Sequence, residues 1–599
     1  MCRIAGVINP LFSNSILLEW TNTMCNKLVH GGPDSGGTYA VPDNHLVLGN
    51  RRLALQDLSN AGMQPMHYAN RYSITYNGEL YNFPSLKQEL ITLGYTFQNH
   101  TDTEVILAAF AHWNTQAFAK FSGMFAFALW DNQEKELYIV RDPAGMKPLY
   151  YSLSNGGLVF ASEIKAMKVI PYLQEENEQW PVYLLAYGHL PEPVTTLKNV
   201  RPLHKGCYLK YNAINSTHSY QSFAHFSYTR ELQDKEKIIR DIENIIYNSV
   251  ERHLIADAPI GVFLSGGLDS SVIARVAANV GKSTLNTFSL YFQEASYSEK
   301  KFQDLLLNDL KCNAYQHLLT ESEFHDSFPE ILEDMDIPGC DGINTWFISK
   351  YARQQGLKAV LSGIGGDELF GGYPSFSRMA LASRLQKIPL HGISNLGSAG
   401  LKQLDRLSYL RLGGIKGIYL FLRGHFSPLQ IAQQLQASEK DVWNILESAP
   451  VLGDVDVLKP GNKASWMEFN LYMQNQLLRD ADVMGMAHGV EIRVPMLDSE
   501  LIRYVQSIYP SLKFSGSYKK QLLIDAFGNQ LPEAIWNRPK MGFSFPFTDW
   551  LQNSTYLKDM VSNKDGATQK NYNRFMKGKL HWSQMLSILL LQTTKANIH

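Results

Sequence analysis

The pattern of the sequence changes near Asp234, and this change most limits how the 599 residues can fold. Before it, short apolar or alternating runs such as Ile4–Ile8 and Met124–Trp130 recur between turn signals, which predicts stacked, largely antiparallel sheets. After it, long helical patterns alternate with short apolar strands that end in glycine loops, as Pro259–Leu264 and Ala359–Leu361 do. That alternation predicts a parallel sheet with ligand-binding loops at the carboxyl ends of its strands.

Length and composition narrow the class of protein. A chain of this length needs several domains, because single cores rarely grow beyond about 250–300 residues. The net charge is −1 without a long basic run, so nothing indicates nucleic acid or a membrane surface as a partner. The five cysteines form no CxxC pair, which is typical of a reducing compartment. With no secretory signal pattern and no apolar run long enough to span a membrane, we expect a cytoplasmic protein.

Cys2 directly follows the initiator Met1. Removal of Met1 would leave a thiol and a free α-amine on one residue. An α-amine has a pKa of about 8 and can accept the thiol proton, so Cys2 can supply both nucleophile and base. This chemistry suits hydrolysis of the glutamine side-chain amide, which releases ammonia. Taken alone, Cys2 is more simply an incidental residue near a chain end.

Three downstream segments, NRRLAL, YNGELYN and HTDTEV, supply the groups that free glutamine needs. Each places a charged or amide side chain at the end of an apolar run. Arg52 can bind the α-carboxylate bidentately, and Glu79 and Asp102 can hold the α-ammonium. Asn77 and the backbone N–H of Gly78 can form an oxyanion hole. Together with Cys2, these segments predict a glutaminase site.

The loop SGGLDS lies between an apolar strand and a helical segment. Its glycines let backbone N–H groups approach phosphate, and the following helix N-terminus favours an anion. The loop lacks the GK[ST] sequence of a Walker A motif, and a plain glycine turn is the alternative. Asp269 within it is a candidate ligand of Mg²⁺. The strand–loop–helix context favours a nucleotide site.

A second glycine loop, SGIGGDELFGGY, also follows a strand. Its glycines cost conformational entropy, which indicates that the backbone must approach a ligand closely. Asp367 is a second candidate Mg²⁺ ligand, and Ser362 and Gly363 can contact the nucleotide. Lys520 can stabilise the phosphoryl oxygens during transfer. A structural ion pair is an equal alternative for three charged residues further along the chain: Lys520, Arg493 and Glu491.

The chain resembles glutamine-hydrolysing asparagine synthetases over nearly its whole length. The segments MCRIAGV, HGGPD, NGELYNF, TDTE and GMFAFALWD follow the order of the family's class II glutaminase domain. The segments IGVFLSGGLDSS, LSGIGGDELFGGY, MAHGVEIRVPMLD and LPEAIWNRPKMGF follow the order of its synthetase domain. We therefore expect an α+β glutamine amidotransferase domain at 1–205, a connector at 206–234 and an α/β ATP-pyrophosphatase domain at 235–599.

The resemblance implies an αββα Ntn-hydrolase sandwich followed by an adenine-nucleotide alpha-hydrolase-like domain. It implies a ligase in which ATP, with Mg²⁺, converts an acceptor carboxylate to an acyl-AMP and releases pyrophosphate. Ammonia would reach that intermediate through an internal tunnel, shielded from water. The implied substrates are glutamine, ATP and aspartate or another carboxylate. The oligomeric state stays open, with a homodimer among the alternatives.

The expected site residues fall into four groups. The catalytic groups are Cys2, Asn77, Gly78 and Lys520. The glutamine contacts are Arg52, Leu53, Ala54, Leu55, Gln56, Asn77, Gly78, Glu79 and Asp102. The nucleotide contacts are Leu264, Ser265, Gly266, Gly267, Asp269, Ser270, Leu290, Ser362 and Gly363. The acceptor pocket comprises Ile364, Asp367 and Glu368.

The sequence departs from the family pattern in three places. The family's HRGPD is HGGPD here, with Gly31 in place of arginine, so one cation near the glutaminase pocket is missing. Ile364 stands where asparagine synthetases typically have glutamate, so the proton lost on ammonia attack needs another acceptor. The candidates are Glu368, Asp341 or a phosphate oxygen. A DEP-type segment reads DIP at Asp336–Pro338. We expect the last two changes to make the acceptor pocket less polar.

Three hypotheses follow. The leading one is synthesis of asparagine from aspartate, glutamine and ATP. The alternative is the same chemistry on another carboxylate, such as a sugar acid or a secondary metabolite, which Ile364 and the segment Pro374–Phe376 motivate. A non-enzymatic descendant is disfavoured, because Cys2, Asp269 and Asp367 are all intact.

Overall fold

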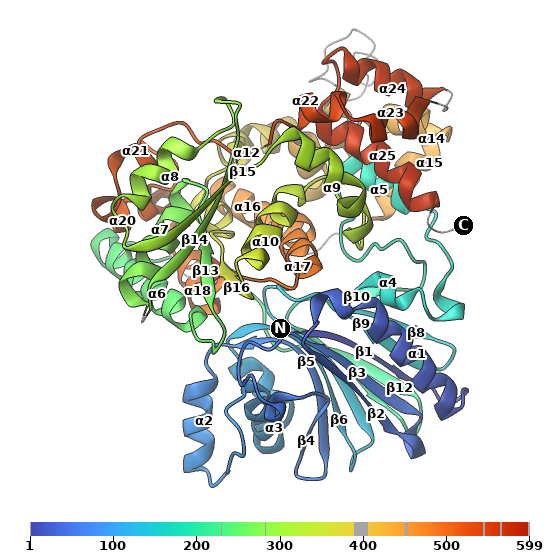
Figure 1. Cartoon of the computed structure of the whole chain (residues 1–599). Coiled ribbons are helices and arrows are strands. Elements are labelled where there is room, and N and C mark those ends of the chain that lie inside the picture. The colour runs from blue at the N-terminus through green and yellow to red at the C-terminus, as the bar shows by residue number, and fades with distance from the viewer. Residues whose placement is uncertain are drawn as a thin grey trace.

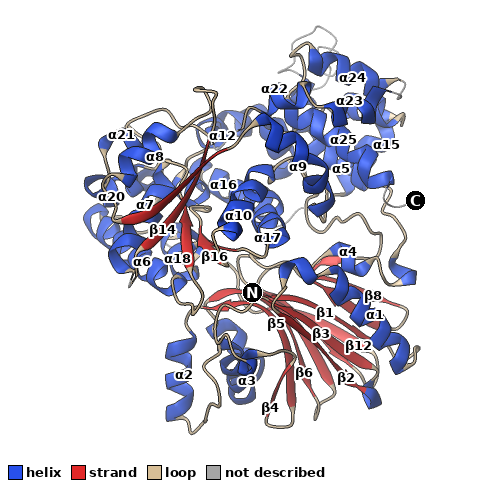
Figure 2. Cartoon of the chain, in the orientation of Figure 1, coloured by secondary structure: helices blue, strands red, loops and turns tan. Residues whose placement is uncertain are grey.

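The computed structural model describes residues 2–228, 231–281, 283–388, 405–449, 453, 455–542, 545–562 and 566–596. Met1, whose removal is expected, lies outside them. The chain forms an N-terminal part built on two antiparallel sheets and a C-terminal part in which many helices surround a parallel sheet (Figure 1). Figure 2 shows the contrast, with strands dominating the first part and helices the second. No helix in the described ranges is long and apolar enough to cross a membrane.

The N-terminal part is a sandwich of two six-stranded sheets. The first has the order β10 (Arg201–Pro202), β8 (Tyr150–Ser154), β9 (Gly157–Ala161), β1 (Cys2–Ile8), β3 (Leu46–Arg52) and β2 (Ser35–Val41). The second has the order β12 (Thr217–Ser222), β11 (Cys207–Asn212), β7 (Glu136–Arg141), β6 (Gly123–Asp131), β5 (Tyr72–Leu80) and β4 (Met66–Tyr68). The short apolar runs of the sequence are therefore strands, as expected.

Helices cover both outer faces of this sandwich. Ile4 and Leu48 of the first sheet pack against Ala128 and Ile139 of the second, which closes the inner core. The outer face of the first sheet packs against α1 (Asn14–Lys27), and α4 (Ile164–Met167) adjoins it. The second sheet packs against α2 (Phe83–Thr92) and α3 (Asp102–Trp113). The layers are α-β-β-α, which confirms the expected Ntn-hydrolase architecture.

Part of the expected connector at 206–234 lies within the sandwich. Residues 207–222 form the hairpin β11–β12, which extends the second sheet beyond β7. The inward residues of β11, such as Leu209 and Tyr211, are buried, whereas β12 is a largely exposed edge strand. Because an edge strand carries few apolar residues and the hairpin turn is polar, the segment looked like a loop in the sequence.

The C-terminal part contains a parallel sheet with the order β15 (Cys312–Leu318), β14 (Leu285–Tyr291), β13 (Ile260–Phe263), β16 (Ala359–Leu361) and β17 (Glu491–Arg493). The expected strands are confirmed at β13 and β16, which are neighbours. A glycine loop follows each of them and leads into α7 (Leu268–Val280) or α11 (Gly366–Phe370). Both loops therefore leave the sheet at the same edge.

Helices enclose the parallel sheet and extend into a helical region at one end (Figure 1). The helix expected at 461–486 forms as α16 (Pro460–Met467), a π-helical stretch (Glu468–Leu477) and α17 (Leu478–Ala487). The helix α5 (Trp180–Tyr187), which precedes the sandwich hairpin in the sequence, packs against four helices of the helical region: α13 (Gly414–Arg423), α14 (Pro428–Leu435), α15 (Glu439–Ser448) and α25 (Trp582–Ala596).

The described residues of the C-terminal part form further helices: α6 (Lys235–His253), α8 (Lys300–Leu307), α9 (Glu321–Asp334), α10 (Ile343–Gln354), α12 (Pro374–Leu385), α18 (Ser499–Gln506), α19 (Pro510–Lys513), α20 (Gln521–Phe527), α21 (Glu533–Trp536), α22 (Phe547–Gln552), α23 (Thr555–Ser562) and α24 (Ala567–Met576).

Candidate active sites

Cys2 begins β1 and lies opposite Arg52 of β3. Burial raises the pKa of the Cys2 thiol, although the backbone of Leu53, the charge of Arg52 and the side chain of Asn50 each oppose the rise. A thiol with a raised pKa is protonated at neutral pH and is a poor nucleophile until a base removes its proton. A base at the site would activate the Cys2 thiol, and its own α-amine is the group expected to do so.

Asn77 and Gly78 lie in the middle of β5. Asn77 is fully buried, and neither atom of its side-chain amide has a hydrogen-bond partner among the described residues. An unsatisfied buried amide costs about 1–3 kcal/mol, so this side chain is suited to a ligand that completes its hydrogen bonds. A Cβ atom at Gly78 would overlap the carbonyl oxygen of Met124 and the backbone of Phe125. Only glycine fits there.

Replacing Asn77 with alanine tests the oxyanion role. We expect kcat for glutamate release to fall by about 10²–10³, because one donor to the tetrahedral oxyanion is lost, while KM for glutamine changes little. Steady-state glutaminase kinetics give both parameters. A raised KM with unchanged kcat would instead assign Asn77 to ground-state binding of glutamine.

Glu79 and Asp102 lie close enough to interact electrostatically, and their role in holding the glutamine ammonium stays a prediction. Gln56 Nε2 donates to Glu79 Oε2 at 2.5 Å, and Arg493 Nη2 lies 3.4 Å from Glu79 Oε1. Burial raises the pKa of Glu79 to about 8, with Glu491 and Asp102 adding negative charge and Arg493 opposing them. One guanidinium thus faces several carboxylates. A bound ammonium group would restore the charge balance, since an opposite charge nearby favours the ionised carboxylate.

Arg52 makes contacts that the sequence did not suggest. Its guanidinium donates to the backbone carbonyls of Ser59 at 2.9 Å and Gln56 at 3.2 Å, and also to that of Asp57. Arg52 therefore shapes the loop after β3, and its role toward the glutamine carboxylate stays a prediction. Within this loop Leu53 and Leu55 are buried, and the Ala54 N–H donates to an Asp34 carboxylate oxygen at 2.8 Å.

The two glycine loops of the C-terminal part border one cavity of about 870 Å³. Within the first loop, Ser265 Oγ and Ser270 Oγ are 2.9 Å apart, and the Gly267 N–H donates to Ser265 Oγ at 3.2 Å. The volume lies in the upper range of ligand sites, large enough for a nucleotide beside a second substrate. The cavity contains most of the expected nucleotide and acceptor residues: Ser265, Gly267, Asp269, Ser270, Ser362, Gly363, Ile364, Asp367, Glu368 and Lys520.

Lys520 joins the two expected Mg²⁺ ligands. Its Nζ contacts Asp269 Oδ2 and lies 2.5 Å from Asp367 Oδ1, and Lys540 Nζ lies 2.6 Å from the same Asp367 oxygen. Despite burial, the two lysines lower the pKa of Asp367 to about 2. Lys520 also has a left-handed φ of +58°, and such outliers cluster at functional sites. The structure thus brings the candidate catalytic lysine and both candidate metal ligands together.

The geometry of the site also explains why glycine occupies two positions of the second loop. A Cβ atom at Gly366 would overlap the carboxylate of Asp269, and one at Gly372 would overlap Asp367 and Lys520. Asp269 Oδ1 is buried and lacks a hydrogen-bond partner within the described ranges. Two carboxylates with an unsatisfied oxygen fit Mg²⁺, which typically binds one or two protein carboxylates together with substrate phosphates.

Some nucleotide contacts expected from the sequence do not border the cavity. Leu264 and Leu290 are buried in the sheet, where the Leu264 N–H donates to the Phe288 carbonyl at 2.8 Å. Gly266 also lies outside the lining residues, and its carbonyl accepts a hydrogen bond from Arg538 Nη2 at 2.9 Å. Sequence reasoning gave no role to Arg538 or Lys540. Both lie in LPEAIWNRPKMGF, where two basic residues on either side of Pro539 were the available signal.

Glu368 and Asp341 add acidic groups to the lining of this cavity. Tyr373 OH donates to Glu368 Oε1 at 2.7 Å, and burial raises the pKa of Glu368 to about 7 and that of Asp341 to about 6. A carboxylate that titrates near neutrality is suited to accept a proton. Among the described residues, no lysine or arginine forms an ion pair with Glu368 or Asp341. Ile364 also lines this cavity.

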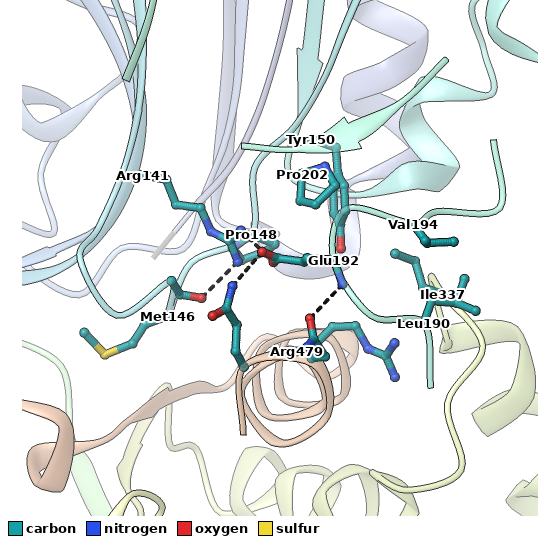
Figure 3. Close-up of a pocket in the computed structure, with 13 residues that line it drawn as sticks. Arg141, Met146, Pro148, Tyr150, Leu190, Glu192, Val194, Pro202, Ile337 and Arg479 are labelled. Carbon is teal, nitrogen blue, oxygen red and sulfur yellow. Dashed lines mark hydrogen bonds and ion pairs between the residues drawn. The ribbon is translucent and has the colours of Figure 1, made fainter. Parts of the chain in front are cut away.

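The DIP segment does not lie in the acceptor cavity, which corrects the expectation that it makes that pocket less polar. Asp336 accepts hydrogen bonds from the backbone N–H groups of Ile164 at 2.6 Å and Lys165 at 2.7 Å, so it anchors the N-terminal part. Ile337 borders a separate interface cavity of about 30 Å³ (Figure 3). There Arg141 Nη1 lies 2.8 Å from Glu192 Oε1. A volume of this size holds little more than a water molecule.

Comparison with known proteins agrees with this geometry. Residues 1–223 match the glutamine amidotransferase domain family, and residues 241–580 match the asparagine synthase family. The fold and the paired sites define a ligase that uses glutamine as its nitrogen donor. The chain belongs to the asparagine synthase family, and its activity is ATP-dependent amidation of the asparagine synthetase type.

The relatives span nearly the full length of the chain. Asparagine synthetase (glutamine-hydrolyzing) 1 of Bacillus subtilis is 32% identical, covering 96% of this chain and 92% of the relative. A putative asparagine synthetase (glutamine-hydrolyzing) of Mycobacterium tuberculosis is 29% identical, covering 88% and 84%. A protein named amidase chry2 from Gibberella zeae is 26% identical, covering 92% and 90%. Relatives that match nearly the whole chain therefore carry different names.

Proposed function

We propose that the chain releases ammonia from glutamine at Cys2 and transfers it to a carboxylate that ATP has converted to an acyl-AMP. The observation that carries this proposal is the contact of Lys520 with both Asp269 and Asp367, where two glycine loops meet. A lysine between two carboxylates beside phosphate-binding loops suits transfer of a nucleotidyl group better than simple binding of a nucleotide. The unpaired cysteines fit a cytoplasmic location.

In the glutaminase reaction, the α-amine of Cys2 accepts the thiol proton and Sγ attacks the carboxamide carbon. The Asn77 amide and the Gly78 N–H donate to the oxyanion. The amine returns its proton to the leaving nitrogen, so ammonia departs and a thioester remains. Water then hydrolyses the thioester to glutamate and frees the thiol.

In the synthetase reaction, a carboxylate oxygen of the acceptor attacks the α-phosphorus of ATP, and pyrophosphate leaves. Lys520 donates to the phosphoryl oxygens as negative charge moves onto the leaving group. Asp269 and Asp367 would hold Mg²⁺, which supplies charge neutralisation for pyrophosphate when bound. Ammonia then attacks the acyl carbon, Glu368 or Asp341 accepts the proton, and AMP leaves with formation of the amide.

Arg493 connects the two sites. Its guanidinium faces Glu79, while its backbone carbonyl accepts a hydrogen bond from the Ser362 N–H at 2.8 Å. The strand β17 therefore reaches from the glutamine pocket to the second nucleotide loop. This short connection supports direct passage of ammonia between the sites, shielded from water and protonation.

Aspartate is the first candidate acceptor, because the synthetase names of the relatives imply it. A second candidate is another carboxylate, such as a sugar acid or a secondary metabolite. Neither Glu368 nor Asp341 forms an ion pair with a lysine or arginine in the part of the chain that the structure describes, so these two residues hold no cation that could bind the α-carboxylate of aspartate. Ile364 adds apolar surface to the same cavity.

A pyrophosphate-release assay separates the two candidates. Free ammonia replaces glutamine, so that only the synthetase site is tested, and aspartate is compared with a panel of sugar acids, amino acids and peptide carboxylates. We expect pyrophosphate and AMP to form in equal amounts with the true acceptor. Turnover with aspartate at the level of the best substrate would eliminate the second candidate, and absence of aspartate turnover would eliminate the first.

A further inference from the structure

Arg3, the residue after Cys2, is a fully buried arginine between the two parts of the molecule. Because side chains alternate along a strand, Arg3 lies on the opposite face of β1 from Cys2. Its Nη1 lies 2.6 Å from Asp482 Oδ2 on α17, and its Nε lies 2.6 Å from Glu163 Oε1 after β9. One side chain thus links the strand of the nucleophile to a helix of the C-terminal part.

Gly31 leaves the space that this side chain fills. A Cβ atom at Gly31 would lie 2.8 Å from Arg3 Cγ and 2.9 Å from Arg3 Nε, too close for any side chain unless Arg3 moved. The turn η1 (Val29–Gly31), which carries Gly31, itself packs against α17. Arg3 therefore places a guanidinium beside position 31, where HGGPD lacks the family's arginine.

Further charges surround Arg3 on every side. Lys147 Nζ lies 3.0 Å from Asp482 Oδ1, and Glu163 also pairs with Lys165 at 2.8 Å and with His30 at 3.0 Å. Despite burial, the charges of Lys165 and Arg3 hold the pKa of Glu163 well below its usual range. Removing one partner from such a buried group leaves an uncompensated charge, which is strongly unfavourable.

We propose that Arg3 is a positioning residue that holds the Cys2 end of β1 against α17. We further infer that Arg3 and Gly31 form a reciprocal pair, in which the arginine can occupy either position but not both. Loss of the link would let β1 shift relative to the C-terminal part, and displacements of about 1 Å can lower a rate by roughly 10²-fold. The pyrophosphate readout of the test below rests on the whole of the proposed function, whereas the glutaminase readout rests only on its first step, the release of ammonia from glutamine.

The test compares Arg3→Gly, Gly31→Arg and the double variant with the native enzyme. We expect each single change to lower glutaminase kcat/KM by roughly 10²-fold. The double variant should recover most of this loss, because it restores one arginine in the shared space. Such recovery is a coupling between sites, which independent structural damage does not produce. Ammonia-dependent pyrophosphate release should change far less than glutamine-dependent release in all three variants.

Arg71→Gln is the matched control, since Arg71 pairs with Asp131 at 2.7 Å within the N-terminal sandwich and is 32% exposed. It should leave both activities near the native level. A double variant no more active than the single variants would overturn the reciprocal pair. Equal losses of the glutamine- and ammonia-dependent reactions would overturn the positioning role in favour of general stability. Native protein that releases glutamate but no pyrophosphate would contradict the proposed function, while the four-way glutaminase comparison would still decide the role of Arg3.

Discussion

Replacing Cys2 with alanine is expected to abolish glutamine hydrolysis while leaving the ammonia-dependent reaction intact. The thiol is the only nucleophile assigned to the glutaminase site, and removal of a catalytic nucleophile typically costs a factor on the order of 10⁴ or more. The nucleotide loops, which lie at the edge of a different sheet, keep their geometry. The measurement is glutamate release with glutamine, alongside pyrophosphate release with ammonium salt.

Cys25→Ala is the control for this variant. Cys25 lies on α1, is buried and unpaired, and has a pKa that burial raises to about 11. Its removal should have little effect on glutamate release. Glutaminase activity that survives in Cys2→Ala would show that another residue is the nucleophile, and the assignment of the N-terminal site would be wrong.

Replacing Lys520 with methionine is expected to have the opposite effect. The variant should lose pyrophosphate release by about 10²–10³-fold, because a cation that stabilises the developing charge is absent. Asp269 and Asp367 would then lie close together without the positive charge of Lys520. Repulsion between two nearby carboxylates raises the pKa of such a pair. Glutamate release should persist, since Cys2 and Asn77 are unchanged.

Lys300→Met is a suitable control, because Lys300 pairs with Asp304 at 2.8 Å on the surface of α8, outside the cavity lining. Both activities should stay near the native level. If Lys520→Met released pyrophosphate at the native rate, Lys520 would be a structural partner of the two carboxylates, the alternative that the sequence left open.

Features that depend on neighbouring residues could be predicted from the sequence. The loops after β13 and β16 were predictable, because a strand, a glycine loop and a helix follow one another within about a dozen residues in each case. Their meeting at one edge follows from parallel strands being adjacent. The contact of Lys520 with Asp269 and Asp367 spans more than 150 residues, and the sequence predicted only that Lys520 acts on the phosphoryl oxygens or forms an ion pair, without naming these partners.

Features that depend on tertiary contacts could not be predicted. Nothing in the sequence singles out Arg3, and Gly31 looked like the loss of a cation. The neighbouring residues do not indicate that the Arg3 side chain fills the space beside Gly31. Asp336 looked like part of the acceptor pocket, whereas its carboxylate binds backbone N–H groups after β9. Buried ion pairs between distant segments leave no periodic pattern in a sequence.

The central claim is that the nitrogen freed at Cys2 is consumed at the nucleotide site. Its most direct test quantifies glutamate and pyrophosphate in the same reaction, with glutamine, ATP, Mg²⁺ and the acceptor identified by the ammonia assay. The proposed mechanism predicts equal amounts of the two products and a rise of both when the acceptor is added. Glutamate that accumulates while ATP is never cleaved between its α and β phosphates, whatever carboxylate is supplied, would contradict it.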